Sequence, residues 1–178
     1  MRKYIAMPIA ALILAAAILL AGYNGLGSYR EQRLQQELTA KMQTLLPGST
    51  TFTPEEYTGE DANIRLVFKG ETGYVIQTVT GGYAGDITML IGVSNEGKVT
   101  GLQVRQMRET YGLGGEALTD WEFLAQFLNT EGDVTVGTDV DSLTGATVTS
   151  KAIARSVNSA VGFVTGADGD SGATSWEG

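Results

Sequence analysis

The sequence predicts an α+β domain with an antiparallel sheet and flanking helices, placed after an N-terminal transmembrane helix. Strand-like runs follow one another along the chain, and helical patterns stand before and after them, which is typical of the α+β class. An uncharged apolar stretch near the N-terminus has the length of a membrane span. The four strand-like runs are residues 64–68, 74–80, 87–93 and 99–104.

The apolar stretch predicts a single-pass anchor. Met1-Arg2-Lys3 is followed by an uncharged stretch from Tyr4 to Tyr29, whose apolar centre is Ile5 to Gly22. A helical span needs about 20 mostly apolar residues, whereas the apolar region of a secretory signal is about 7–15 residues long. We expect an uncleaved anchor, with a cleaved signal peptide as the alternative. The positive start predicts that the N-terminus stays inside.

A second helix is expected directly after the anchor. Its apolar residues recur at helical spacing, and Pro47-Gly48 should end it. This stripe packs either on the chain's own domain, which we favour, or on a partner protein of the same assembly. The residues of the stripe are Leu34, Leu38, Met42 and Leu45.

Two local signals organise the middle of the chain. Asn95-Glu96-Gly97 predicts a hairpin turn, because Gly97 tolerates a positive φ. Thr119-Asp120-Trp121-Glu122 has the pattern of a capping box and predicts that a helix opens there. The expected apolar face of that helix consists of Trp121, Leu124, Phe127 and Leu128.

The segment Asp141–Thr147 combines an acidic residue, hydroxyls and a glycine ahead of another helical pattern. Thr149 or Ser150 is expected to cap this helix. A helix N-terminus offers unpaired N–H groups and a positive dipole end, which suit a phosphate. Gly145 and Ala146 allow a ligand to approach the backbone closely. From spacing alone, a polar loop that caps a structural helix explains the segment equally well. The helical pattern consists of Ile153, Val157, Ala160, Val161 and Val164.

The residues Asp141-x-x-Thr144-Gly145-Ala146-Thr147 resemble the flavinylation motif of one FMN-binding domain family. The G protein of the Rnf complex and the C protein of the Nqr complex share this domain. In that family a flavin transferase joins the FMN phosphate to the last Thr of the motif, which implies Thr147 here. The resemblance further implies that the transferase reads Asp141, and that other residues of the segment contact FMN. Those residues are Thr144, Gly145, Ala146, Thr149 and Ser150.

Two further segments resemble the same family. Residues 109–114 are similar to its Glu-Thr-Pro-Gly-Leu-Gly loop near the flavin ring, although Tyr111 replaces Pro and so removes a fixed φ and adds an N–H. Gly82-Tyr83-Ala84-Gly85 resembles its Gly-Tyr-x-Gly entry to a central strand. A plain glycine turn is the alternative for the loop. The implied FMN contacts are Tyr83, Gly85, Glu109, Thr110, Gly112, Leu113 and Gly114.

Composition narrows the chemistry. The chain has no Cys and no His, which excludes disulfides, thiolate-bound iron–sulfur clusters and His-ligated metal or haem within it. Redox work must therefore rest on an organic cofactor or on a partner. The net charge of −8 argues against a nucleic-acid partner. We divide the chain into an anchor with its linker (1–29), an amphipathic helix (30–48), an FMN-binding domain (49–164) and an acidic, Gly-rich tail expected to be disordered (165–178).

The tail holds a second copy of the motif. Asp168–Thr174 repeats the pattern with Ser in place of the first Thr, and no helical pattern follows it. We interpret it as a chance or vestigial copy, with a second flavin site at Thr174 as the alternative.

The resemblance implies an electron-carrier subunit without a catalytic side chain of its own. The expected setting is the ion-translocating ferredoxin:NAD oxidoreductase (Rnf) complex, with FMN joined covalently to Thr147 and the FMN domain outside the cytoplasm. Expected partners are the other membrane subunits, and the flavin transferase during maturation. Alternatives are a protein like the C protein of the Nqr complex, a freestanding extracytoplasmic flavoprotein, or a non-redox, membrane-anchored assembly or binding module.

Overall fold

The computed structural model describes residues 33–107 and 120–167. The chain divides into two compact units, Met1–Ala40 and Lys41–Gly178, and a helix over residues 33–45 crosses this boundary. No helix within the described residues is both long and apolar enough to cross a membrane. The expected anchor, the Glu109–Gly114 loop and the tail copy of the motif lie outside the described residues.

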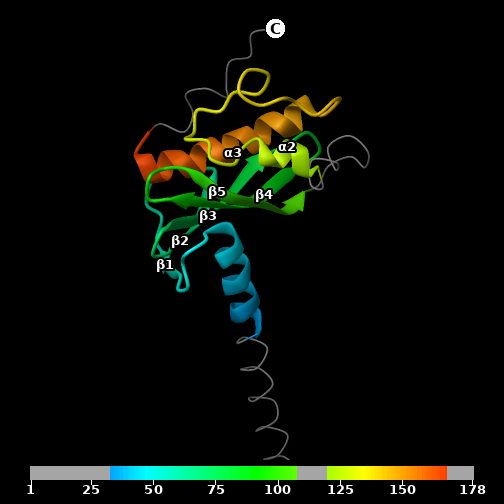
Figure 1. The fold of residues 1–178 in the computed structure, drawn as a ribbon. Helices are drawn as coiled ribbons and strands as arrows, with labels where there is room; N and C mark the ends of the chain where they lie inside the picture. Colours follow the sequence, from blue (N-terminus) through cyan, green and yellow to red (C-terminus); the bar gives the residue numbers. More distant parts are fainter. Residues whose placement is uncertain (1–32, 108–119, 168–178) are drawn as a thin grey trace, which may run out of the picture. The chain divides into compact units, whose positions relative to one another are not determined.

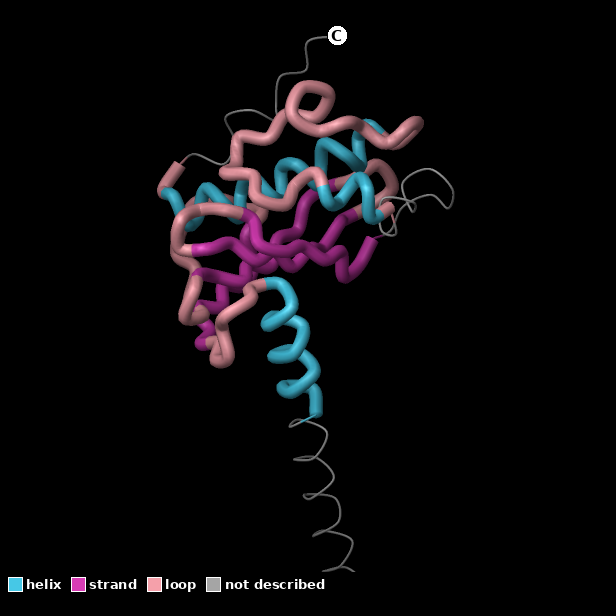
Figure 2. Tube along the Cα trace, in the orientation of Figure 1, coloured by secondary structure: helices cyan, strands magenta, loops and turns pink. Residues whose placement is uncertain are grey.

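The second unit contains a five-stranded antiparallel sheet whose strands follow in chain order (Figures 1 and 2). The four strands expected from the sequence are confirmed. β1 was not expected, because it has only three residues, includes Pro54 and is exposed throughout. The strands are β1 (Thr53–Glu55), β2 (Ile64–Lys69), β3 (Gly73–Gly81), β4 (Asp86–Ser94) and β5 (Val99–Met107).

Alternating side chains place the hydrophobic core on one face of the sheet. On β4, every second residue from Ile87 to Val93 is fully buried in the main core cluster, as expected of a strand with period two. The hairpin expected between β4 and β5 is confirmed. Gly97 has φ +83°, and the N–H of Ser94 donates to the carbonyl of Lys98 at 2.8 Å.

The helices α2 (Trp121–Ala125) and α3 (Thr147–Thr165) cover this core face (Figure 1). α3 is buried from two sides. The hydroxyl of Thr80 on β3 donates to the carbonyl of Ala152 at 3.0 Å. On the other side, the amide of Asn158 accepts from the N–H of Val134 at 2.8 Å and donates to its carbonyl at 3.1 Å. α3 is therefore held between the sheet and the segment that precedes it.

The apolar face expected for α2 was partly wrong. Trp121 is 70% exposed, whereas Phe123 is buried and packs edge-on against Phe127 with ring centroids 5.4 Å apart. The Asp120 carboxylate caps the helix by accepting from the N–H of Phe123 at 2.9 Å. Because the helix begins directly after Asp120, Trp121 takes its first position and faces outward. Thr119, the expected first residue of the capping box, lies outside the described residues.

The end of the helix over residues 33–45 docks on the opposite face of the sheet. Met42 and Leu45 are buried, and the hydroxyl of Thr100 on β5 donates to the Leu45 carbonyl at 2.6 Å. The helix ends before Gly48, which has φ +89°. The expected end at Pro47-Gly48 is confirmed, as is packing on the chain's own domain for these two residues of the stripe. Leu34, at the other end, is 66% exposed.

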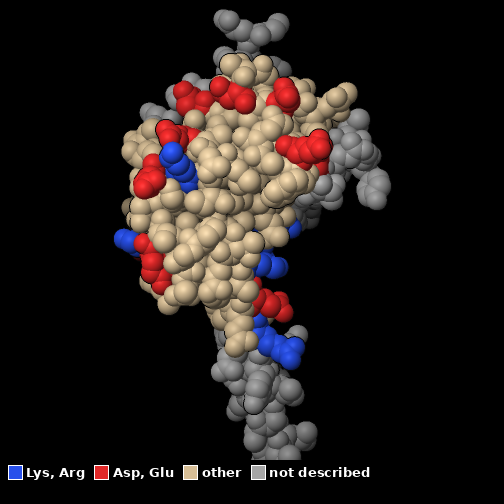
Figure 3. Space-filling model, in the orientation of Figure 1, with Lys and Arg blue, Asp and Glu red and all other residues tan. Residues whose placement is uncertain are grey.

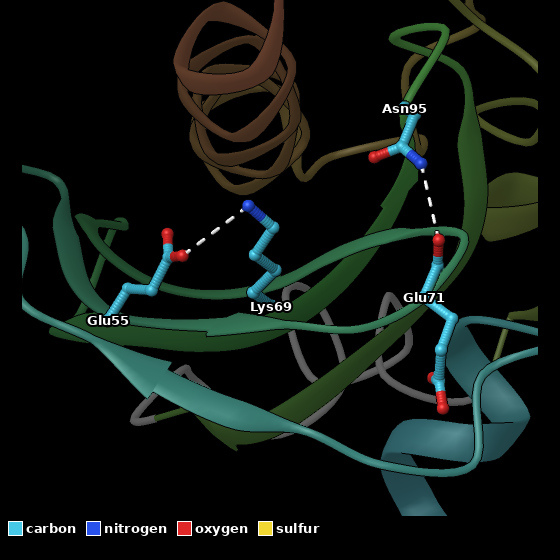
Figure 4. A network of polar contacts seen from close by, with 4 residues as sticks. All are labelled: Glu55, Lys69, Glu71 and Asn95. Atoms are coloured by element: carbon cyan, nitrogen blue, oxygen red, sulfur yellow. Dashed lines mark hydrogen bonds and ion pairs between the residues drawn. The ribbon is translucent and has the colours of Figure 1, made fainter.

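The Glu71 carboxylate fastens the segment after that helix to the turn between β2 and β3. It accepts hydrogen bonds from the hydroxyl and the N–H of both Thr50 and Thr51, at distances of 2.9–3.4 Å. The Glu71 carbonyl accepts from the side chain of Asn95 at 3.4 Å (Figure 4). On the neighbouring strands, Lys69 and Glu55 form an ion pair at 3.8 Å.

This carboxylate predicts a pH dependence of stability. Hydrogen bonds, first from the N–H of Glu71 itself and then from Thr51 and Thr50, lower the pKa of Glu71 from 4.5 to about 2. A lowered folded-state pKa gives stabilisation that is complete above the unfolded pKa and disappears as the pH falls through the folded one. We expect Glu71→Gln to lower the thermal midpoint at pH 7, with a difference from wild type that shrinks between pH 4.5 and pH 2.

A pH series of thermal unfolding checks this expectation. Glu56→Gln, which removes another exposed negative charge of the same domain, serves as the control. An equal difference between wild type and Glu71→Gln at pH 7 and pH 2 would contradict the assigned role of the Glu71 carboxylate.

Candidate functional site

The segment Asp141–Thr147 forms a tight turn that leads into α3. The N–H of Ala146 donates to the carbonyl of Leu143 at 2.9 Å, and Gly145 has φ +76°. A residue with a Cβ rarely adopts this φ, so the turn explains why glycine stands at this position of the segment.

α3 begins at Thr147, earlier than the sequence pattern predicted. Ala146 is the N-cap and makes no side-chain capping bond, so the expected cap at Thr149 or Ser150 is wrong. Both residues lie inside the first turns of the helix and are buried, with 1% and 0% exposure. The Ser150 hydroxyl points back toward the turn, donating to the Ala146 carbonyl at 3.0 Å and accepting from the N–H of Leu143 at 3.1 Å.

Thr147 occupies the first position of this 19-residue helix and is exposed. The first N–H groups of a helix have no carbonyl four residues back to bond, and they carry the positive end of the helix dipole. Thr144 and Gly145, on the adjoining turn, are also exposed. A phosphate ester on the Thr147 oxygen would therefore find N–H donors beside it and no side chain covering it.

The start of the segment is held by α2. The side-chain carbonyl of Gln126, the C-cap residue of α2, accepts from the N–H of Asp141 at 2.8 Å. The Asp141 residue itself is exposed, so its carboxylate is accessible to another protein. Sequence reasoning missed Gln126, because no local pattern signals a contact with a residue fifteen positions away.

The turn between β3 and β4 is attached to α3 at its base. The N–H of Gly82 donates to the carbonyl of Gly85 at 2.8 Å, and Tyr83 is 72% exposed. The guanidinium of Arg155 donates to the carbonyl of Gly81 at 2.9 Å. The structure thus joins the base of this predicted FMN-contact turn to α3, while the Glu109–Gly114 loop lies outside the described residues.

The basic residues of α3 follow Thr147 along one row. Lys151 and Arg155 stand four and eight residues after Thr147, a spacing that places them on the same side of a helix. Acidic side chains gather on the surface near α3 and the segment before it (Figure 3), and Glu131, Asp133 and Asp139 of that segment are exposed. Positive charge therefore lies beside Thr147 in a domain whose surface is otherwise largely acidic.

The described residues contain no group of three His, Cys, Asp or Glu side chains that could hold a metal ion. The donors around Thr147 are hydroxyls, N–H groups and a glycine turn, and these suit an organic phosphate.

Comparison with known proteins agrees with this chemistry. Residues 82–162, from the β3–β4 turn through most of α3, match the FMN-binding domain family. The chain is 30% identical to the G protein of the ion-translocating oxidoreductase complex of Methanosarcina acetivorans over 169 residues, which are 87% of this chain and 89% of that protein. It is 29% identical over 174 residues to the G protein of the Na⁺-translocating ferredoxin:NAD⁺ oxidoreductase complex of Acetobacterium woodii, covering 84% of each.

A shorter match, 38% identical over 99 residues, links it to the G protein of the proton-translocating ferredoxin:NAD⁺ oxidoreductase complex of Clostridium ljungdahlii, covering 52% of this chain and 53% of that protein. The chain belongs to this family of G proteins of ion-translocating oxidoreductase complexes, and the resemblance seen in the sequence is confirmed.

Proposed function

We propose that this chain is the FMN-carrying electron-transfer subunit of an ion-translocating ferredoxin:NAD oxidoreductase complex, with the flavin joined through its phosphate to Thr147. The observation that carries the proposal is the exposed threonine at the first position of a 19-residue helix, directly after a glycine turn. Membership of the same family as the G proteins of these complexes supports the complex as its setting.

The residues around Thr147 divide into those that would hold the phosphate and those that would border the ring. The phosphate would lie among the first N–H groups of α3, including that of Thr149, with the Thr144 hydroxyl close by. Tyr83 and Gly85, with the loop Glu109–Gly114, would border the ring. When bound, the isoalloxazine ring accepts and releases electrons, while the protein supplies its position and electrostatic surroundings.

We also propose that the chain reaches its partners from a membrane. The apolar stretch Tyr4–Tyr29 would form one span, with the N-terminus inside and the FMN domain outside the cytoplasm. The other subunits of the complex would be its permanent partners, and a flavin transferase would bind it during maturation. Protease added to intact cells should then cleave after Arg30. Full protection of a chain that is cleaved in lysed cells would contradict this topology.

The intact mass of the full chain tests the cofactor directly. Produced together with a flavin transferase, the chain should be heavier than the unmodified protein by one FMN less one water. Its yellow colour should remain with the protein after denaturation. A chain of unmodified mass from the same host would contradict the covalent link and would favour a non-redox assembly or binding module.

A further inference from the structure

Ser150 links both ends of the turn that leads to Thr147. Its hydroxyl accepts from the N–H of Leu143 and donates to the carbonyl of Ala146, at 3.1 and 3.0 Å. The turn's own bond joins the N–H of Ala146 to the carbonyl of Leu143 at 2.9 Å. We call these three hydrogen bonds the Ser150 clamp. Ser150 is fully buried, so water does not compete for its hydroxyl.

The clamp also fixes the point at which the helix begins. The carbonyl of Ala146 accepts from the N–H of Ser150 at 2.9 Å as well as from its hydroxyl. Both bonds hold the residue just before Thr147 against the first turn of α3. The backbone of Thr147 is therefore fixed from both sides, although its own side chain is exposed.

The same arrangement sorts the threonines of the segment. Thr149 is 1% exposed, so its hydroxyl is closed to another enzyme. Thr144 and Thr147 are both exposed, but only Thr147 lies on α3, where helix N–H groups can bind a phosphate. Burial thus excludes one hydroxyl, and the position of the helix start separates the other two.

We propose that Ser150 is a positioning residue for flavin attachment, acting through the clamp on Thr147 rather than by touching FMN. This inference rests on the proposed function. In the attachment step, the Thr147 oxygen forms a bond to the FMN phosphorus of a flavin nucleotide phosphoanhydride. The anhydride P–O bond breaks, a nucleoside monophosphate leaves, and the threonine proton passes to a base of the transferase. No electrons are exchanged. Fixed orientation of the attacking oxygen accelerates such a displacement.

The tail copy of the motif offers a comparison within the same chain. Glu177 stands three residues after Thr174, where the upstream copy has Ser150, and Asp170 stands in the place of Leu143. An ionised carboxylate has no O–H to donate to a carbonyl, so Glu177 is unable to replace the serine in the clamp. The two copies share the acidic residue and the Gly-Ala-Thr core but differ at the clamp position.

The test compares Ser150→Ala with Ser156→Ala in the full chain. Ser156 lies on the same helix, is equally buried, and its hydroxyl contacts that of Thr80 at 2.9 Å. Both variants lose one buried hydroxyl, but only Ser150→Ala opens the clamp. With a flavin transferase and flavin adenine dinucleotide, Ser150→Ala should be loaded roughly tenfold more slowly than Ser156→Ala, the scale expected for two lost hydrogen bonds.

A second measurement uses the protein without flavin. Amide hydrogen exchange at Leu143 should be slow in wild type and in Ser156→Ala, and fast in Ser150→Ala. If Ser150→Ala fails to fold, the isosteric pair Ser150→Thr and Ser150→Val replaces it. The threonine variant, which retains the hydroxyl, should then be loaded faster than the valine variant.

Equal loading rates for Ser150→Ala and Ser156→Ala would overturn the role of the clamp while leaving the proposed function intact. Equal rates for the threonine and valine variants would do the same. A wild-type chain that is not modified at Thr147 would instead overturn the proposed function, and the inference with it.

Discussion

Thr147→Ala is expected to abolish covalent flavin and, with it, electron transfer through this protein. The change removes the only atom to which the phosphate would be joined. Thr147 is exposed at the first position of α3, so alanine, a good helix former, leaves the fold unchanged. We expect the intact mass to revert fully to that of the unmodified chain, with an unaltered thermal midpoint of the unloaded protein.

Two controls make this result specific. Thr147→Ser retains a hydroxyl at the same position and should still be loaded. Thr174→Ala removes the last residue of the tail copy and should leave both the mass and electron transfer unchanged, because no helical pattern follows that copy to supply N–H donors. Peptide mapping that finds flavin only on the tail peptide would reverse the assignment. Flavin on both peptides would mean that this protein carries two flavins.

Sequence reasoning predicted the sheet because its information is local. The four longer strands are runs of β-branched and aromatic residues separated by turn signals, and Gly97 marks its hairpin unambiguously. β1 carries no such signal, because its three residues are all exposed and pairing with β2 alone makes it a strand. The edge of the sheet is thus defined by a partner strand that lies more than ten residues away.

The site was predicted in its chemistry but not in its geometry. The hydroxyls of Thr149 and Ser150 favoured a helix cap, because Ser and Thr are common N-caps. In the structure the Ser150 hydroxyl is used instead across the turn, and the helix starts three residues before it. The same limit explains why Gln126 and Arg155 were missed. Each reaches a backbone group that is distant in sequence, and such contacts follow from packing rather than from a local pattern.

The second large effect is expected on the other face of the sheet, at Gly92. A Cβ at this position would lie 2.1 Å from the carbonyl oxygen of Leu45 and 2.8 Å from the hydroxyl of Thr100. The contact is with backbone, so no side-chain rotation relieves it. We expect Gly92→Ala to lower the free energy of unfolding by about 3 kcal/mol, the upper part of the range for overpacked cores, as measured by denaturant unfolding.

Neighbouring glycines provide graded controls for this prediction. A Cβ on Gly101 would lie 2.8 Å from the Leu45 Cα and should cost less, whereas a Cβ on Gly81 would meet nothing within 4 Å. Because Gly92 and Thr100 both act through the Leu45 carbonyl, the double variant Gly92→Ala/Thr100→Ala should lose less stability than the two single variants added together. An equal loss for all three glycine variants would show that general strand weakening, and not the seat of Leu45 on the sheet, explains the effect. Strict additivity in the double variant would show that the Thr100 hydroxyl and the space at Gly92 support the fold independently.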